Sequence, residues 1–340
     1  MGRVRRVAKI LRRAGTKVEL GTSEELGIPR GFVGGMHETE GGILNPGKLT
    51  RVVRRALLES SARVFEQTKI TDVVRTDGRV VLSTPGGQVR AGRVVFATNA
   101  FAGEWDITPR HLSVPLWVIE VETAPIDPDR LMELGWTSRS ALVTQHNIME
   151  NYRLTSRNTI VFGVRRIERG KDFPLPMSEK SPDPALVDEL AGAFAHRFPS
   201  LADVRVARSW GGWIATTPSW LPVAGQIDGD VFYSVACNGH GLAQAPYVGT
   251  LIADLLVDGV RPADLDVLWA DKPRFPRPFM MSPLGLRRPG PSTASTTWST
   301  GVAGTLARER SGLRHPRERA ARRPRNAASP TPPMRAQPLT

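Results

Sequence analysis

A glycine-rich turn between a strand and a helix is the segment of this sequence best suited to chemistry. Residues 231–236 (VFYSVA) have the apolar, β-branched and aromatic character of a strand, residues 238–241 (NGHG) form a tight turn, and residues 242–256 follow helical periodicity. A helix that starts at such a turn presents unpaired backbone N–H groups and the positive end of its dipole. The segment therefore predicts a site for an anion or for developing negative charge, although such turns also serve purely structural ends.

The cysteine and histidine residues predict neither a disulfide nor a metal site. Cys237 is the single cysteine, so the chain forms no internal disulfide, and no group of Cys and His residues has zinc-ligand spacing. Cysteine usage of this kind is typical of a reducing compartment, and we expect a cytoplasmic protein. No run approaches the roughly 18 apolar residues of a membrane span. We therefore expect no metal site and no membrane span.

The net charge of +13 comes from the two ends of the chain. Residues 1–17 carry seven basic residues and no acidic one, and residues 281–340 carry 11 Arg against two Glu. Residues 18–280 therefore hold 28 basic and 31 acidic residues, a net charge of −3. Since a nucleic-acid footprint needs basic residues on a folded face, we expect no nucleic-acid partner for the body.

The first part of the body contains one clear helix and several strands. Asn45 and Pro46 open a helix through residues 49–60, because Asn caps helices and Pro is tolerated in the first turn. Its expected buried stripe comprises Leu49, Val52, Val53, Ala56 and Leu57. A short strand is expected at residues 64–65, and hairpin turns at Asp77-Gly78 and at residues 85–87. Residues 94–97 (VVFA) are apolar on both faces, which predicts a parallel strand covered on both sides.

Three further regions complete the organisation. Residues 1–17 form either an amphipathic helix with its stripe at Val4, Val7, Ile10 and Leu11, or a transit peptide. Residues 106–207 carry scattered β runs that predict an inserted antiparallel sheet. Residues 281–340 contain few large apolar residues and are expected to be a disordered basic tail. The fold class predicted is mixed α/β.

Five blocks in order resemble the FAD-dependent amine and amino-acid oxidoreductases of the D-amino-acid oxidase type, in particular the gamma-glutamylputrescine oxidase and glycine oxidase branch. The blocks are residues 41–49 (GGILNPGKL), 93–100 (RVVFATNA), 210–212 (WGG) with 217–218 (TP), 221–225 (LPVAG) and 237–241 (CNGHG). The resemblance implies a partial Rossmann-like FAD-binding sheet made of residues 45–105 and 208–262. It implies a substrate domain made of residues 18–44 and 106–207.

The resemblance also implies an activity and a set of site residues. Such an enzyme moves hydride from the carbon beside an amine to FAD, and the imine is then hydrolysed. The cofactor-binding residues that it implies are Ile70, Thr98, Asn99, Ala100, Gly239, His240, Gly241 and Leu242. Arg165, with Arg166 beside it, is the expected ligand for a substrate carboxylate, because a guanidinium grips a carboxylate bidentately. Trp213 and Tyr152 either line the pocket or belong to the core, and His240 is either a spacer or a proton shuttle.

Two departures from the family pattern qualify these expectations. Some relatives tether flavin through a cysteine at a position where this chain has Gly212, so we expect non-covalent FAD. The family's G-x-G-x-x-G turn is absent from the sequence, which suggests that the first βαβ unit is missing and the chain truncated. Loss of that unit is expected to leave the strands at residues 94–97 and 231–236 with an open edge.

Three functions therefore remain open. The first is an FAD-dependent oxidoreductase that acts on a small-molecule amine or amino acid, with activity limited by the absent fingerprint. The second is a non-catalytic remnant or binding module. The third is a subunit whose flavin domain is completed by a partner chain that supplies the fingerprint. The sequence names neither the amine nor the oligomeric state, and it does not separate an oxidase from a dehydrogenase.

Overall fold

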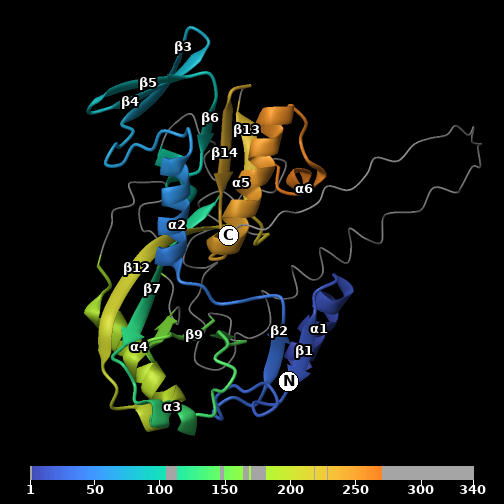
Figure 1. Ribbon diagram of the computed structural model, residues 1–340, viewed down its shortest axis with the longest axis vertical. Helices are drawn as coiled ribbons and strands as arrows, with labels where there is room; N and C mark the ends of the chain where they lie inside the picture. Colours follow the sequence, from blue (N-terminus) through green and yellow to red (C-terminus); the bar gives the residue numbers. More distant parts are fainter. Residues whose placement is uncertain are drawn as a thin grey trace, which may run out of the picture. The chain divides into compact units, whose positions relative to one another are not determined.

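The fold is taken from a computed structural model. It describes residues 2–104, 113–145, 149–163, 168–169, 181–217, 219–227 and 229–269. All of these fall within one compact unit, Met1–Ser295, and the basic tail expected at 281–340 lies outside the described residues. The secondary structure is mixed α/β, as predicted (Figure 1).

The N-terminal segment folds as a helix against a hairpin. Helix α1 (Gly2–Arg13) packs on strands β1 (Val18–Gly21) and β2 (Gly35–Glu38), which pair antiparallel. The expected helix is confirmed, but its buried face differs from the expected stripe. Val4 and Ala8 are buried, whereas Ile10 is 44% exposed. The reason is that the two-stranded hairpin of β1 and β2 is too narrow to cover the whole apolar stripe of the helix.

Helix α2 (Pro46–Glu59) starts where the sequence predicts. The side chain of Asn45 accepts a hydrogen bond from the backbone N–H of Lys48 at 2.9 Å, and Pro46 occupies the first turn. None of the residues of α2 is buried, and Val52 is 55% exposed. The expectation of a buried stripe is therefore wrong for the described residues, because a stripe is buried only when another element packs on it.

A three-stranded meander follows α2. It comprises β3 (Asp72–Thr76), β4 (Arg79–Thr84) and β5 (Gly87–Ala91), all antiparallel. Asp77 and Gly78 have φ values of 51° and 68°, as a tight two-residue hairpin turn requires, so this predicted turn is confirmed. The strand predicted at residues 64–65 is wrong: the segment forms no strand, and Phe65 is 65% exposed.

A small mixed sheet contains the one parallel strand pair among the described residues. Its order is β13 (Val223–Ile227), β14 (Val231–Val235) and β6 (Val94–Phe96), and β6 runs parallel to β14. One face packs with Val80 of the meander, and the other face meets helix α5 (Gly241–Asp258) through Ala224. Figure 1 shows α5 beside the strands of this sheet. Strand β6 lies at the edge, and Val95 is 38% exposed, so the expectation that this strand is covered on both faces is wrong within the described residues.

The largest sheet is antiparallel, as predicted for the middle of the chain. Its strands are β7 (Val114–Thr123), β8 (Leu142–Val143), β9 (Asn151–Leu154), β10 (Ile160–Gly163), β11 (Glu168–Arg169) and β12 (Val206–Thr216). Strand β7 is central, with β12 along one edge and β10 and β11 along the other. The pairing of β12 with β7 extends to Thr216, so residues 210–212 belong to this sheet.

One face of the large sheet is the main hydrophobic core. Trp117, Ile119 and Val121 of β7 point into it, and helix α4 (Pro184–Arg197) covers it through Phe194. Phe194 stacks on Phe162 at 4.6 Å between ring centroids. Four short helices complete the described elements: η1 (Asn99–Glu104), α3 (Pro128–Glu133), η2 (Pro199–Leu201) and α6 (Ala263–Asp266). None of the helices in the described ranges is long and apolar enough to cross a membrane.

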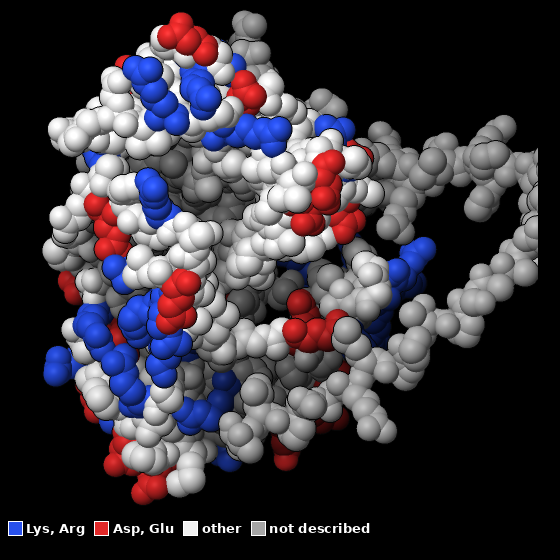
Figure 2. Space-filling view, turned by 45° about the horizontal axis from the view of Figure 1, so that its top comes forward, with Lys and Arg blue, Asp and Glu red and all other residues white. Residues whose placement is uncertain are grey.

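Charge on the described surface is mixed. Figure 2 shows Lys and Arg side chains on the same face as Asp and Glu side chains. This distribution agrees with the near-neutral count for residues 18–280.

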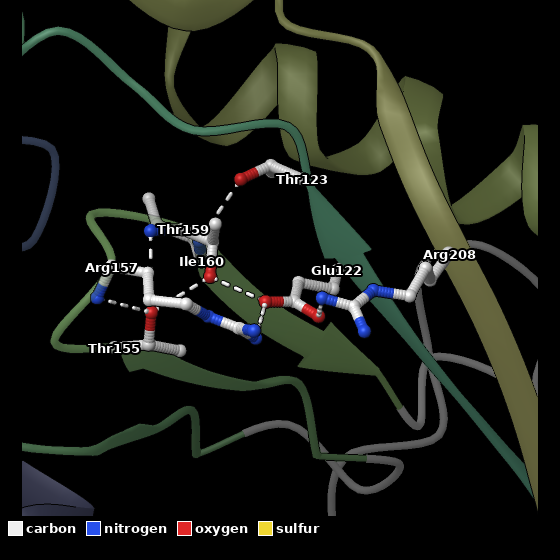
Figure 3. Close-up of polar contacts among 7 residues, drawn as sticks. All are labelled: Glu122, Thr123, Thr155, Arg157, Thr159, Ile160 and Arg208. Carbon is white, nitrogen blue, oxygen red and sulfur yellow. Dashed lines mark hydrogen bonds and ion pairs between the residues drawn. The ribbon is translucent and has the colours of Figure 1, made fainter.

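The opposite face of the large sheet carries a buried carboxylate. Glu122 of β7 is 4% exposed and lies between Arg157 and Arg208, at 2.8 and 3.2 Å from its oxygens (Figure 3). The hydroxyl of Thr159 donates a further hydrogen bond at 2.6 Å. The carboxylate thus links β7, β12 and the turn before β10.

We predict that Glu122→Gln lowers the free energy of unfolding by roughly 1–3 kcal/mol, since hydrogen bonds from charged donors are lost. Urea denaturation measures the change. Glu38→Gln, at an exposed position on β2, is the control and is expected to stay within about 0.5 kcal/mol of the wild type. Equal effects in the two variants would contradict a structural role for Glu122.

Candidate functional site

The carboxyl ends of β6 and β14 lie next to each other because the two strands are parallel neighbours. The segment after β6 holds Thr98, Asn99 and Ala100, and the segment after β14 leads into α5. The backbone N–H of Cys237 donates to Oδ1 of Asn99 at 3.2 Å. The fold therefore brings together two blocks that are more than 130 residues apart in the sequence. Ligands of open α/β sheets bind at this kind of edge.

The backbone at this edge is strained. The φ angles of Asn99, Ala236, Asn238 and Gly239 are 47°, 70°, 50° and 80°. Positive φ is uncommon outside glycine and costs on the order of 1 kcal/mol or more for Ala. Such strain persists only where surrounding contacts hold it, and it concentrates at binding sites.

Asn238 is the residue that holds the turn. It is 2% exposed, and its Nδ2 donates to the carbonyl of Ala236 at 2.7 Å. Its Oδ1 accepts from the backbone N–H of Thr217 at 2.8 Å, and its own N–H donates to Ala215 at 3.0 Å. The small sheet is thereby tied to the end of β12. Asn238 was outside the expected site residues, although an Asn-Gly pair between a strand and a helix is a signal for such a turn.

Helix α5 begins at Gly241 with its N-terminus uncapped by a side chain. The ring Nδ1 of His240 bonds the carbonyl of Asn238 at 2.9 Å, and a carbonyl only accepts, so Nδ1 carries the hydrogen. His240 therefore stabilises the turn and does not cap the helix. A Cβ on Gly241 would lie 3.2 Å from Cβ of Cys237, so glycine keeps this corner narrow. Leu242 follows with 48% of its surface exposed.

Two buried polar atoms flank the turn without a hydrogen-bond partner among the described residues. They are Oγ1 of Thr98, just after β6, and Oε1 of Gln244, in the first turn of α5. Buried polar atoms are rarely left unpaired, so their presence marks a place where a polar ligand fits. With the free helix N-terminus, this edge has the donors and acceptors that a flavin ring requires.

The remaining expected site residues are distributed as follows. Ile70 is half-buried just before β3, and the described hydrogen bonds do not link it to the turn. Tyr152 belongs to the core, where its hydroxyl donates to Glu150 at 3.0 Å, so the pocket-lining alternative is wrong for it. The indole of Trp213 packs edge-on against that of Trp117, with 5.3 Å between the ring centroids. Arg165 and Arg166 lie outside the described residues.

The face of the large sheet that lies opposite the core begins next to this turn and extends from it along β12 and β7. A Cβ on Gly239 would lie 3.9 Å from Cδ1 of Ile214, so the turn adjoins β12. Ile214 pairs with Leu116, and the same face continues along β7 to Glu120. Burial raises the pKa of the Glu120 carboxyl, while Arg153 and Asn151 oppose the rise. No group of three or more His, Cys, Asp or Glu residues in the described part of the chain suits a metal ion.

We predict that Asn238→Ala lowers the free energy of unfolding by roughly 2–4 kcal/mol, because a buried N–H and a buried carbonyl lose their partner. Asn158→Ala is the matched control. Asn158 has a similar φ of 57°, so it shares the backbone cost but not the buried side-chain hydrogen bonds. Urea denaturation compares the two, and an equal loss would mean that only the φ angle matters.

We predict that Glu120→Gln raises the free energy of unfolding at neutral pH. The pKa of this carboxyl is higher in the folded chain than the ordinary 4.5, so ionisation destabilises the fold as pH rises through the raised value. The gain is therefore expected to be larger at about pH 8 than at about pH 5. Denaturation at both pH values measures it, and a gain independent of pH would contradict this electrostatic cause.

Comparison with proteins of known sequence finds partial but consistent matches. Gamma-glutamylputrescine oxidoreductase of Escherichia coli is 27% identical over 252 residues, which cover 73% of this chain and 55% of the relative. The chain spans about half the length of the curated relatives it matches.

Solved structures share the fold. L-proline dehydrogenase from P. horikoshii superimposes with a TM-score of 0.65 at 22% identity, covering 77% of this chain and 70% of that one. Glycine oxidase from Geobacillus kaustophilus gives 0.61 at 22% identity, covering 75% and 66%.

The family described as FAD dependent oxidoreductase matches residues 1–255. This match confirms the resemblance expected from the five sequence blocks. The chain belongs to the FAD-dependent oxidoreductase family of the D-amino-acid oxidase type.

Proposed function

We propose that this chain serves in FAD-dependent oxidation of an amine or amino acid at the C–N bond. The observation that carries the proposal is the edge where β6 and β14 end, with an uncapped α5 and the unpartnered atoms of Thr98 and Gln244. Membership of the family supplies the cofactor class. The relatives cover more sequence than this chain, and the activity of the whole protein is part of the proposal.

In this proposal the described residues hold and polarise the cofactor. The N–H groups at the start of α5 would favour negative charge on the flavin ring, with Gly239, His240, Gly241 and Leu242 forming that contact. Thr98, Asn99 and Ala100, in the segment after β6, would hold the cofactor, and Ile70 would contact its adenine part. Bound FAD would supply the hydride acceptor for oxidation of the carbon beside the amine, and water would hydrolyse the imine product. Arg165 remains the proposed ligand for a substrate carboxylate.

The proposed division of labour follows the sheets, except that residues 208–216 of β12 pair within the large sheet. Residues 45–105 and 208–262 contribute β6, β13, β14 and α5 to cofactor binding. Residues 18–44 and 106–207 contribute the substrate side, and Ile28 and Phe32 of the first segment pack on the core of the large sheet. FAD is proposed to be non-covalent, because Gly212 offers no thiol. The lone Cys237 suits a reducing compartment, and the cytoplasm is the proposed location.

A second candidate function is favoured by the exposed apolar residues of α2. Val52, Val53 and Leu57 are 42–55% exposed, and an apolar helix face of this kind suits burial against another chain. The described residues contain no G-x-G-x-x-G turn for a diphosphate. In this candidate function the chain is a subunit whose dinucleotide-binding sheet is completed by a partner chain.

Titration of the purified full chain with FAD, followed by flavin fluorescence and visible absorbance, tests the first proposal. Gly241→Val is expected to weaken binding at least about tenfold, because its side chain collides with Cys237. Gly249→Ala is the matched control: it lies in the same helix with nothing within 4 Å of the added Cβ, and its affinity is expected to equal that of the wild type.

The outcomes separate the candidate functions. Stoichiometric FAD binding by the full chain supports the oxidoreductase proposal. Binding that appears only when a partner chain is added supports the subunit. A folded chain that never binds FAD contradicts both and leaves a non-catalytic binding module.

A further inference from the structure

Two glutamates of β7 lie on the same face of the large sheet but have very different surroundings. Glu122 accepts hydrogen bonds from Arg157 and Thr159 and forms an ion pair with Arg208. Glu120, two residues earlier, accepts one hydrogen bond, from Nδ2 of Asn151 at 3.0 Å. Its Oε2 is buried and has no hydrogen-bond partner among the described residues.

Arg153, the ion-pair partner given for Glu120 among the described residues, does not satisfy this oxygen. Nη1 of Arg153 lies 3.5 Å from Oε2 of Glu120, which is an ion pair without a hydrogen bond. The same nitrogen donates to Oδ1 of Asn151 at 2.5 Å. Arg153 is thus already engaged, and the carboxylate keeps an unused acceptor on a face that does not pack into the core. Since burial disfavours its charge, the fold gains less from Glu120 than from Glu122.

The neighbours of Glu120 across the sheet are suited to a small cation. On one side Gly163 is its direct partner, and a Cβ there would collide with the carbonyl oxygen of Ile119 and lie 2.9 Å from Cδ of Glu120, so glycine is needed for the close approach of the two strands and for the carboxyl. On the other side Trp210 is its direct partner. Directly opposed residues share a face with their Cβ atoms about 5 Å apart. Trp210 is 42% exposed, which is high for an indole.

We propose that Glu120 and Trp210 bind the ammonium group of a primary-amine substrate, with the carboxylate accepting its hydrogen bonds and the indole contacting its charge. Carboxylate and aromatic groups together are the usual partners of an ammonium ion. This inference rests on the proposed function, since it names the substrate class of the same site.

The position of Glu120 and Trp210 along the sheet indicates which end of the substrate carries the bound ammonium group. Trp210 lies four residues before Ile214, the residue that adjoins Gly239, so the two ends are roughly 13 Å apart along β12. A group held by Glu120 is therefore remote from the N-terminus of α5. The ammonium is the end of the substrate that does not react, as in a linear diamine.

Calorimetric titration of the full chain with octane-1,8-diamine, which is long enough to span most of this distance, tests the proposal, with octan-1-ol as the neutral probe. The wild type is expected to bind the diamine and not the alcohol. Glu120→Gln is expected to weaken diamine binding at least about tenfold, because the ammonium loses a charge-assisted hydrogen bond. Trp210→Leu is expected to weaken it severalfold.

Glu122→Gln is the matched control, because it removes the same charge from the same face of the same strand. Its affinity for the diamine is expected to stay within about twofold of the wild type. Equal weakening in both variants would reduce the effect to general electrostatics and overturn the proposal. So would unchanged binding in Glu120→Gln, or a folded wild type that does not bind the diamine.

FAD titration of the same preparations separates this inference from the proposed function. Diamine binding that depends on Glu120 in a chain that refuses FAD supports the amine site and contradicts the cofactor proposal. FAD binding without any diamine binding supports the cofactor proposal and contradicts the amine site. Circular dichroism checks that each variant is folded, as the stabilisation predicted for Glu120→Gln requires, and Trp210→Leu gives an independent test of the same site.

Discussion

The buried side chain of Asn238 is the interaction on which the rest of the site depends. It bonds its own strand end at Ala236 and the end of β12 at Thr217, and thereby joins the small mixed sheet to the large antiparallel one. Because this side chain satisfies buried backbone groups, the turn can keep positive φ values that are otherwise unfavourable. The N-terminus of α5 is consequently held in one place, beside the end of β6.

The two faces of the large sheet have different tasks. The face covered by α4 is a dense aromatic core, and its contacts account for the burial of Tyr152 and Trp117. The opposite face carries charged residues, and there the fold treats two carboxylates unequally. Glu122 is fully compensated and ties three chain segments together, whereas Glu120 is half-buried and its buried Oε2 is an acceptor to spare. This difference between Glu120 and Glu122 indicates that the carboxylate of Glu120 serves a purpose other than stability.

The small sheet and helix α2 are only partly covered by the other residues that the structure describes. Strand β6 pairs on one side, and the apolar residues of α2 remain exposed in the described part of the chain. Exposed apolar surface is unfavourable in water, so these residues of α2 mark a region that a further contact would stabilise.

The sequence alone determined the features that depend on neighbours along the chain. Asn45 and Pro46 start α2, Asp77 and Gly78 make a hairpin turn, and Gly259 ends α5 with a φ of 70°, because capping and turn chemistry act over a few residues. The family blocks likewise predicted that Thr98–Ala100 and Gly239–Leu242 serve one site. Tertiary structure alone decided the rest. It placed Tyr152 in the core, left the stripe of α2 uncovered, and set Glu120 opposite Trp210. Burial and cross-strand register arise from pairing between distant segments, and local sequence does not encode which segments meet.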